Sequence, residues 1–156
     1  DFNKVTTIGS DILASSYGDG SSIIENITTP ETLTSLSSSF GYSKYLETLD
    51  LSLSIKLKAV PNSLARNCLK LVEVKLPTTI EKINSNAFGN CSNLTSINLP
   101  SKIRSIGSNA FKGANKLIAT FDGTIADFYG LGEDAIGSNA FASGAIVRCK
   151  DGDIKY

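Results

Sequence analysis

The residues of this sequence with the most reactive side chains are its three cysteines, Cys68, Cys91 and Cys149. They are too few and too scattered for a disulfide framework or a four-thiolate zinc site. The sequence contains no histidine. This absence excludes Ser–His and Cys–His nucleophile pairs, imidazole metal ligands and histidine general bases. We therefore expect neither a cofactor nor a metal site.

Carboxylates offer a second kind of chemistry, because paired acidic side chains hydrolyse glycosides. The candidates are Glu25, Glu47, Asp50 and Glu73. Nothing in the sequence places an acid with a raised pKa beside a second carboxylate in a pocket, so we predict no catalytic residue and no enzyme activity. The Asp151-Gly-Asp153 segment lacks the further oxygen ligands of a calcium loop, and a tight turn accounts for it.

Size and charge limit the remaining classes. The 156 residues fit one domain with a real core, and the 15 basic residues balance the 15 acidic ones. This balance gives no electrostatic reason to bind nucleic acid or an anionic membrane. No apolar stretch approaches the roughly 18 to 20 residues that span a bilayer, so we predict no membrane insertion of this segment. A start at Asp1 without any methionine suggests a segment of a longer precursor.

The elements that position these side chains are internal repeats. Residues 71–93 and 94–116 align without a gap as two units of 23 residues. Looser copies occupy 24–45 and 46–70, a partial repeat with a loop insertion occupies 1–23, and 117–156 is assigned to the last strand and a C-terminal cap. The apolar columns that define the alignment are Leu71/Leu94, Val74/Ile97, Leu76/Leu99, Ile80/Ile103, Ile83/Ile106, Ala87/Ala110 and Phe88/Phe111.

Each unit has a local reason to fold. Its Leu-x-x-Ile-x-Leu segment alternates like a strand with one buried face, and the following proline ends that strand. The isoleucines of the next segment return inward on extended backbone. Ser85 and Ser108 are candidate N-caps of a short helical Asn-Ala-Phe turn, and a Gly or Asn then turns the chain into the next strand. Stacked units would form a continuous core and a parallel sheet.

The pattern Leu-x-x-Ile-x-Leu-Pro-x-x-Ile-x-x-Ile-x-x-x-Ala-Phe-x-x-Cys resembles the BspA-like class of leucine-rich repeats. The segments Phe121-Asp-Gly-Thr124 and Ile146-Val-Arg-Cys149-Lys-Asp-Gly152 resemble the closing module of such arrays. The resemblance implies an α/β fold: a right-handed solenoid with a parallel sheet on the concave face. The convex face would carry short helical turns or irregular backbone.

Cys68 and Cys91 occupy the same column of consecutive repeats, and Ala114 occupies it in the next. A thiol pair or a metal site would explain the two cysteines, but only a ladder of small buried residues explains the alanine as well. We therefore assign the two cysteines to a structural core ladder. Phe88 and Phe111, which also share a column, are assigned to the core in the same way.

The strand residues that point away from the core should line the concave face. They are Glu25, Asn26, Thr28, Glu47, Thr48, Asp50, Glu73, Lys75, Ser96 and Asn98, with Val72 and Thr95 beside them. This face is polar and mildly acidic, without an aromatic patch for sugars or an arginine cluster for phosphate. The resemblance implies a non-enzymatic, extracellular adhesion module that binds matrix or host-cell-surface proteins through this face. A spacer that presents another domain, or a glycan-binding accessory module, remains an alternative.

Overall fold

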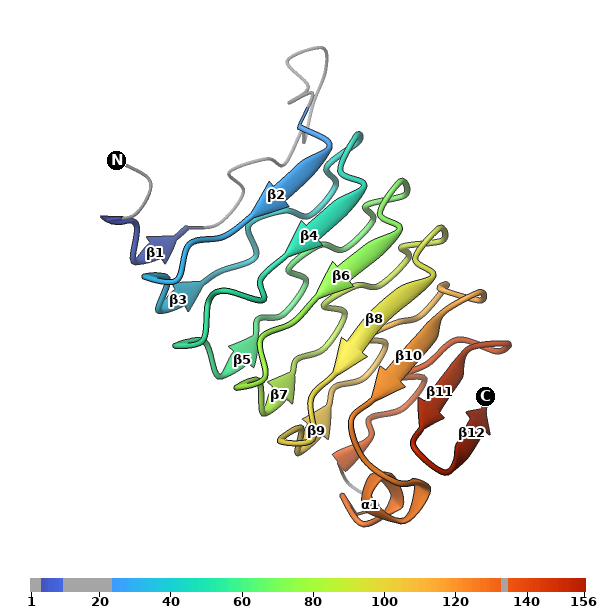
Figure 1. Cartoon of the computed structure of the whole chain (residues 1–156). Coiled ribbons are helices and arrows are strands. Elements are labelled where there is room, and N and C mark those ends of the chain that lie inside the picture. The colour runs from blue at the N-terminus through green and yellow to red at the C-terminus, as the bar shows by residue number, and fades with distance from the viewer. Residues whose placement is uncertain (1–3, 10–23, 133–134) are drawn as a thin grey trace.

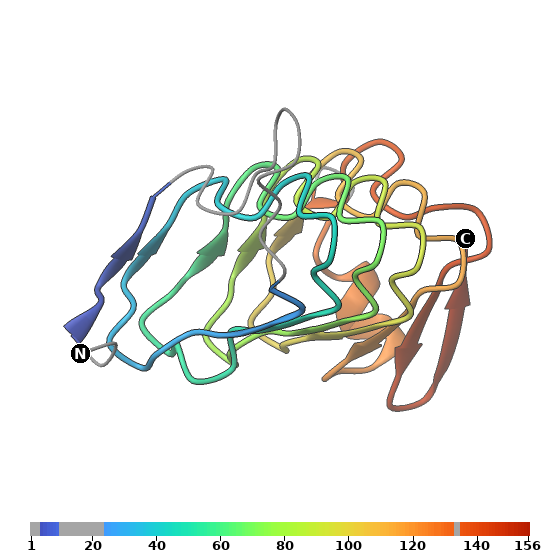
Figure 2. The same ribbon diagram turned by 90° about the horizontal axis from the view of Figure 1, so that it is seen from above.

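The computed structural model of the chain describes residues 4–9, 24–132 and 135–156. These residues form a solenoid whose coils stack along one axis (Figure 1). Each regular coil contributes one strand to a large sheet and one short strand to a smaller parallel ladder on another side of the core (Figures 1 and 2). Most of the partial repeat with its loop insertion predicted at 1–23 lies outside the described residues.

The large sheet has the strand order β12-β11-β10-β8-β6-β4-β2. Its neighbours pair in parallel, except for the antiparallel pair of β11 and β12. The register places equivalent positions of the repeats side by side, as in the pairing of Val74 with Ile97. The strands are β2 (Asn26–Thr28), β4 (Thr48–Asp50), β6 (Glu73–Lys75), β8 (Ser96–Leu99), β10 (Ile118–Phe121), β11 (Ile146–Cys149) and β12 (Gly152–Lys155).

The return segments of the coils form shorter parallel ladders. β5 (Ala59–Val60), β7 (Lys82–Ile83) and β9 (Ser105–Ile106) make a three-stranded sheet, and β1 (Thr7–Ile8) pairs with β3 (Ser35–Leu36). Their inward residues Val60, Ile83 and Ile106 are buried, so the predicted inward return on extended backbone is confirmed. The large sheet and these shorter ladders thus line two sides of the core.

Aromatic side chains stack along the coil axis inside this core. The rings of Phe88 and Phe111 lie 5.6 Å apart and nearly parallel, and those of Phe111 and Phe141 lie 5.2 Å apart. Tyr156 continues the stack, with its ring 4.5 Å from that of Phe141. Each buried ring removes a large apolar area from water, which stabilises the stack by roughly 1.5–3 kcal/mol per side chain.

The turn segments between the two sheets differ from the prediction in one respect. No helix is present among residues 84–116, so Ser85 and Ser108 are not helix N-caps. The residues after these serines instead take left-handed backbone conformations, in the column Ser63, Asn86, Asn109 and Asn139. A second left-handed column contains Tyr42, Asn67, Asn90 and Gly113. Asparagine and glycine tolerate this conformation better than most residues, which explains why they recur there.

Gly107 marks a place where two coils approach closely. A Cβ atom at this position would lie 2.5 Å from the backbone nitrogen of Ser85, and one at Gly137 would collide in the same way with Ser108. Only glycine fits such a contact without a backbone shift.

The C-terminal end adds features that the sequence analysis did not predict. A short helix, α1 (Ile125–Tyr129), begins at Thr124, which forms a capping box with Asp127. Its buried Phe128 meets Phe121 edge to face. The segment after the helix stacks on the preceding coil through bridges from Ile136 and Phe141. One more repeat-like coil therefore follows β10 before β11 and the antiparallel β12 close the sheet.

Candidate functional site

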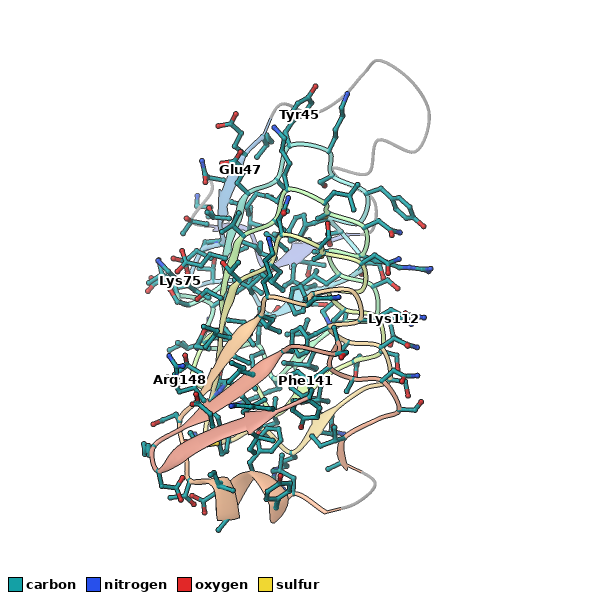
Figure 3. All side chains as sticks on the ribbon, turned by 90° about the vertical axis from the view of Figure 1, so that its right-hand side faces the viewer. Tyr45, Glu47, Lys75, Lys112, Phe141 and Arg148 are labelled. Atoms are coloured by element: carbon teal, nitrogen blue, oxygen red, sulfur yellow. The ribbon has the colours of Figure 1, made fainter. Side chains whose placement is uncertain are left out.

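The outer side of the large sheet, called here the sheet face, carries two rows of side chains that cross the strands (Figure 3). Parallel pairing aligns the first outward residue of each strand into one row and the second into another. The first row is Asn26, Thr48, Glu73, Ser96, Ile118 and Ile146. The second row is Thr28, Asp50, Lys75, Asn98, Thr120 and Arg148.

The structure places the ten residues predicted for this face as follows. Eight of them lie in the two rows, on β2, β4, β6 and β8. Glu25 and Glu47 immediately precede β2 and β4. Half of the ten are exposed and half are half-buried, and none is fully buried. The exposed ones are Glu25, Asn26, Thr28, Lys75 and Ser96, and the half-buried ones are Glu47, Thr48, Asp50, Glu73 and Asn98.

A single cation lies between two carboxylates in the middle of the sheet face. Lys75 Nζ is 3.7 Å from Glu73 Oε2 and 3.9 Å from Asp50 Oδ2. Such solvent-facing pairs stabilise a fold by about 1 kcal/mol at most. Because Glu25 and Glu47 add two further carboxylates nearby, this half of the face has an excess of negative charge.

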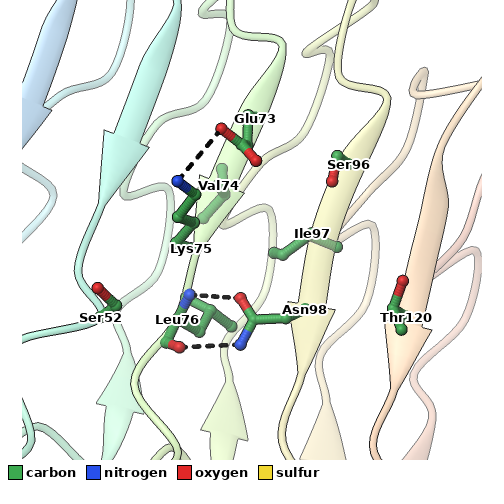
Figure 4. A pocket seen from close by; sticks show the side chains of 9 residues that line it. All are labelled: Ser52, Glu73, Val74, Lys75, Leu76, Ser96, Ile97, Asn98 and Thr120. Carbon is green, nitrogen blue, oxygen red and sulfur yellow. Dashed lines mark hydrogen bonds and ion pairs between the residues drawn. The ribbon is translucent and has the colours of Figure 1, made fainter.

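Asn98 differs from its neighbours because its amide is engaged with the backbone. Its Nδ2 donates to the carbonyl oxygen of Leu76 (2.9 Å), and its Oδ1 accepts from the N–H of the same residue (2.7 Å; Figure 4). The backbone pairing of β6 with β8 reaches only Val74 and Ile97. The Asn98 side chain therefore extends the ladder where backbone pairing has ended.

A shallow hollow of about 340 Å³ lies on the sheet face around this position (Figure 4). Its rim carries the polar side chains of Ser52, Glu73, Lys75 and Ser96, with Thr120 on the next strand. The hollow is open to solvent along the face. This shape suits a side chain of a docked macromolecule better than it suits a small molecule enclosed for reaction.

The sequence analysis missed the C-terminal part of the sheet face. Arg148 holds Asp153 through two hydrogen bonds of 3.1 Å, and Lys150 Nζ lies 2.8 Å from Asp122 Oδ1. Hydrogen bonding to Lys150 lowers the pKa of Asp122, and hydrogen bonding to Asp153 raises the pKa of Arg148. The alternation Ile118-Ala-Thr-Phe121 after Leu117 was the available signal that these strands continue the face.

The thiols of Cys68 and Cys91 lie in the core, away from the sheet face. Cys68 Sγ donates to the carbonyl oxygen of Phe40 (2.9 Å) and Cys91 Sγ to that of Ala65 (3.1 Å). Burial raises the pKa of Cys68 to about 11 and raises that of Cys91 further. Protonated thiols are poor nucleophiles and poor metal ligands. Among the described residues, no three acidic or cysteine side chains are grouped to hold a metal ion.

This geometry defines a class of protein, the leucine-rich-repeat β-solenoids. A family described as the BspA type leucine rich repeat region matches residues 6–143 in six copies. The chain belongs to the BspA-type leucine-rich-repeat family. No curated protein matches the chain.

Two of the solved structures that are similar to the chain come from bacteria. A leucine rich cell surface protein from Faecalibacterium prausnitzii superposes with a TM-score of 0.72 at 21% sequence identity, over 83% of this chain and 33% of that one. A leucine-rich repeat protein from Bacteroides ovatus gives a TM-score of 0.41 at 22% identity, over 86% of this chain and 45% of that one. The chain thus spans less than half the length of either protein. Across the described ranges, no helix has the length and apolar character needed to cross a membrane.

Proposed function

We propose that this chain is a non-catalytic, cell-surface binding module that recognises a protein partner through the sheet face. The observation that carries the proposal is the continuous face itself, with two rows of mostly polar side chains over six parallel strands. Loops and edges of a repeat array vary freely, whereas a stacked sheet holds many side chains in one fixed arrangement.

The chemistry of the face supports a protein over a small molecule. Its excess of carboxylates near Lys75 would attract a basic surface and orient it during encounter. Exposed Val72, beside the first row, adds apolar area that a protein partner could cover. We place the module at the cell surface because the similar protein from F. prausnitzii is described as a leucine rich cell surface protein. Matrix proteins and host-cell-surface proteins are the partners we propose.

A structural spacer is the second candidate. This chain covers only 33% of the similar protein from F. prausnitzii, so a rigid array could serve to present another domain. A glycan-binding accessory role for the sheet face has less support, because the two rows contain no aromatic side chain on which a sugar could stack.

The test is a binding screen of the chain against immobilised collagen, laminin, fibronectin and intact host cells. A variant with Glu47→Arg, Glu73→Arg and Ser96→Arg reverses the charge of the sheet face. Asn98 is left unchanged because its amide holds β6 to β8. We expect saturable binding that falls roughly tenfold or more in this variant, since unfavourable charge contacts in an interface cost several kcal/mol.

A matched control carries Glu31→Arg, Glu81→Arg and Ser35→Arg, which change the net charge equally but lie off the two rows. Binding that the control keeps and the sheet-face variant loses supports the proposal. Binding that both keep would place the site elsewhere, and a chain that binds none of the probes would favour the spacer.

A further inference from the structure

The side of the coil opposite the sheet face carries charge of the other sign. The turn segments at 37–46, 61–70, 84–93 and 107–116 contain no aspartate or glutamate. Their exposed basic side chains, called here the turn face, are Lys44, Arg66, Lys70, Lys112 and Lys116. Figure 3 shows Lys112 on the side of the molecule away from Glu47, Lys75 and Arg148. A chain with balanced overall charge is therefore strongly divided between its faces.

The basic residues of the turn face recur at defined steps along the solenoid. The hydrogen bonds from Asn67 N to Gly89 O and from Asn90 N to Lys112 O place Arg66, Gly89 and Lys112 in one column. By the same register, Lys70, Asn93 and Lys116 form a second column. Each column thus has cations two coils apart, roughly 10 Å, because neighbouring coils are one strand spacing apart.

Two of these cations converge on one ring. Lys44 Nζ and Lys70 Nζ each lie 5.2 Å from the ring centroid of Tyr45. The ring's negative face offsets part of the repulsion between the two ammonium groups. Within the described ranges, none of the five cations forms an ion pair. The turn face therefore holds converging positive charge without an internal counter-charge.

We propose that the turn face binds a linear anionic polysaccharide, one that carries sulfate or carboxylate groups. Charge steps of about 10 Å suit a polymer whose charged sugars are separated by neutral ones. They suit nucleic acid poorly, because each strand carries a phosphate every 3.4 Å. The coil between the paired cations exposes Asn90, Ser92 and Asn93, whose neutral polar groups can hydrogen-bond sugar hydroxyls. The acidic sheet face repels the same polymer. The sheet face therefore stays free for a protein partner while the turn face binds the polysaccharide.

The turn face and the sheet face are different surfaces, so polysaccharide binding by one can be absent while protein binding by the other is present. The experiment measures binding of the chain to chondroitin sulfate and to hyaluronate, which separates sulfate from carboxylate recognition. Polyuridylate RNA and anionic lipid vesicles represent the other polyanions. We expect saturable binding to at least one polysaccharide, which weakens as salt shortens the screening length from about 10 Å at 0.1 M to about 3 Å at 1 M.

The variant replaces Arg66, Lys70, Lys112 and Lys116 with glutamine. The matched control replaces four exposed lysines on the side of the smaller sheet, Lys56, Lys58, Lys82 and Lys102, with glutamine, and so removes the same charge. We expect the turn-face variant to lose roughly tenfold or more in affinity and the control to lose little, with both showing unchanged thermal unfolding. Equal loss in both variants, tighter binding to RNA or vesicles, or no polysaccharide binding at low salt would overturn the proposal.

Discussion

At the scale of the residue, the buried column of Ser43, Cys68, Cys91 and Ala114 shows how position in a repeat decides chemistry. A hydroxyl, two thiols and a methyl group occupy equivalent positions. Ser43 Oγ and Cys68 Sγ both donate to the carbonyl oxygen of Phe40. The column therefore selects for small side chains, and the reactivity of a thiolate is suppressed by burial.

This suppression predicts a pH dependence of stability. Burial raises the pKa of Cys68 from 9.0 to about 11, so the folded state keeps a proton that the unfolded state releases first. The contribution is fully present below pH 9 and is lost as pH rises through about 11. Urea unfolding between pH 7 and 11 should show a shallower decline for Cys68→Ala/Cys91→Ala than for the original chain. Parallel declines of the two curves would contradict this assignment.

At the scale of the element, a side chain extends the short backbone pairing between β6 and β8. β6 has three residues, and its register with β8 contains only two pairs. The amide of Asn98 supplies two more hydrogen bonds to Leu76. A residue predicted for the binding face thus has a structural role within the same face.

Replacing Asn98 should separate the two roles. Asn98→Ala leaves the N–H and carbonyl groups of Leu76 without these partners, and we expect it to lower the free energy of unfolding by about 1–3 kcal/mol. Ser96→Ala, two residues earlier on the same strand, should change it by no more than about 0.5 kcal/mol. Thermal and urea unfolding measure both. If Asn98→Ala unfolds like the original chain, the side chain is not a structural clip.

At the scale of the whole molecule, each coil is stabilised by its contacts with the neighbouring coils along a single axis. The aromatic stack through Phe88, Phe111 and Phe141 ends at Tyr156, which covers the last ring while remaining partly exposed. β12 pairs antiparallel to β11, so the parallel sheet cannot be extended further at this end.

Removing this end should expose the stack. A chain cut after Lys116 loses β10, α1 and both closing strands, and leaves Phe111 and the edge of β8 uncovered. We expect light scattering to show oligomers and circular dichroism to show a less cooperative thermal transition. Removing only residues 150–156 is the milder control, because it takes away β12 and Tyr156 but leaves the parallel sheet. A folded, monomeric 1–116 fragment would refute this role of the cap.

The sequence by itself determined the repeat length, the buried columns and the side chains on the sheet face from β2 to β8. It did so because alternation along a strand, and identity between equivalent positions, are local properties that survive without coordinates. The predicted residues do lie together on one side of the large sheet. Which of them bind a partner stays a prediction.

Only the tertiary structure decided the rest. The turns at Asn86 and Asn109 take left-handed conformations instead of helical ones, because each donates its backbone N–H to the next coil. The sequence Ile136-Gly-Ser-Asn-Ala-Phe141 repeats 106–111, but only the structure shows it stacked as a further coil after β10. The hydrogen bonds of the Asn98 amide to Leu76 also depend on which residues meet across coils. That information lies in the stacking register, which joins residues about one repeat apart and leaves no mark on any single segment of the chain.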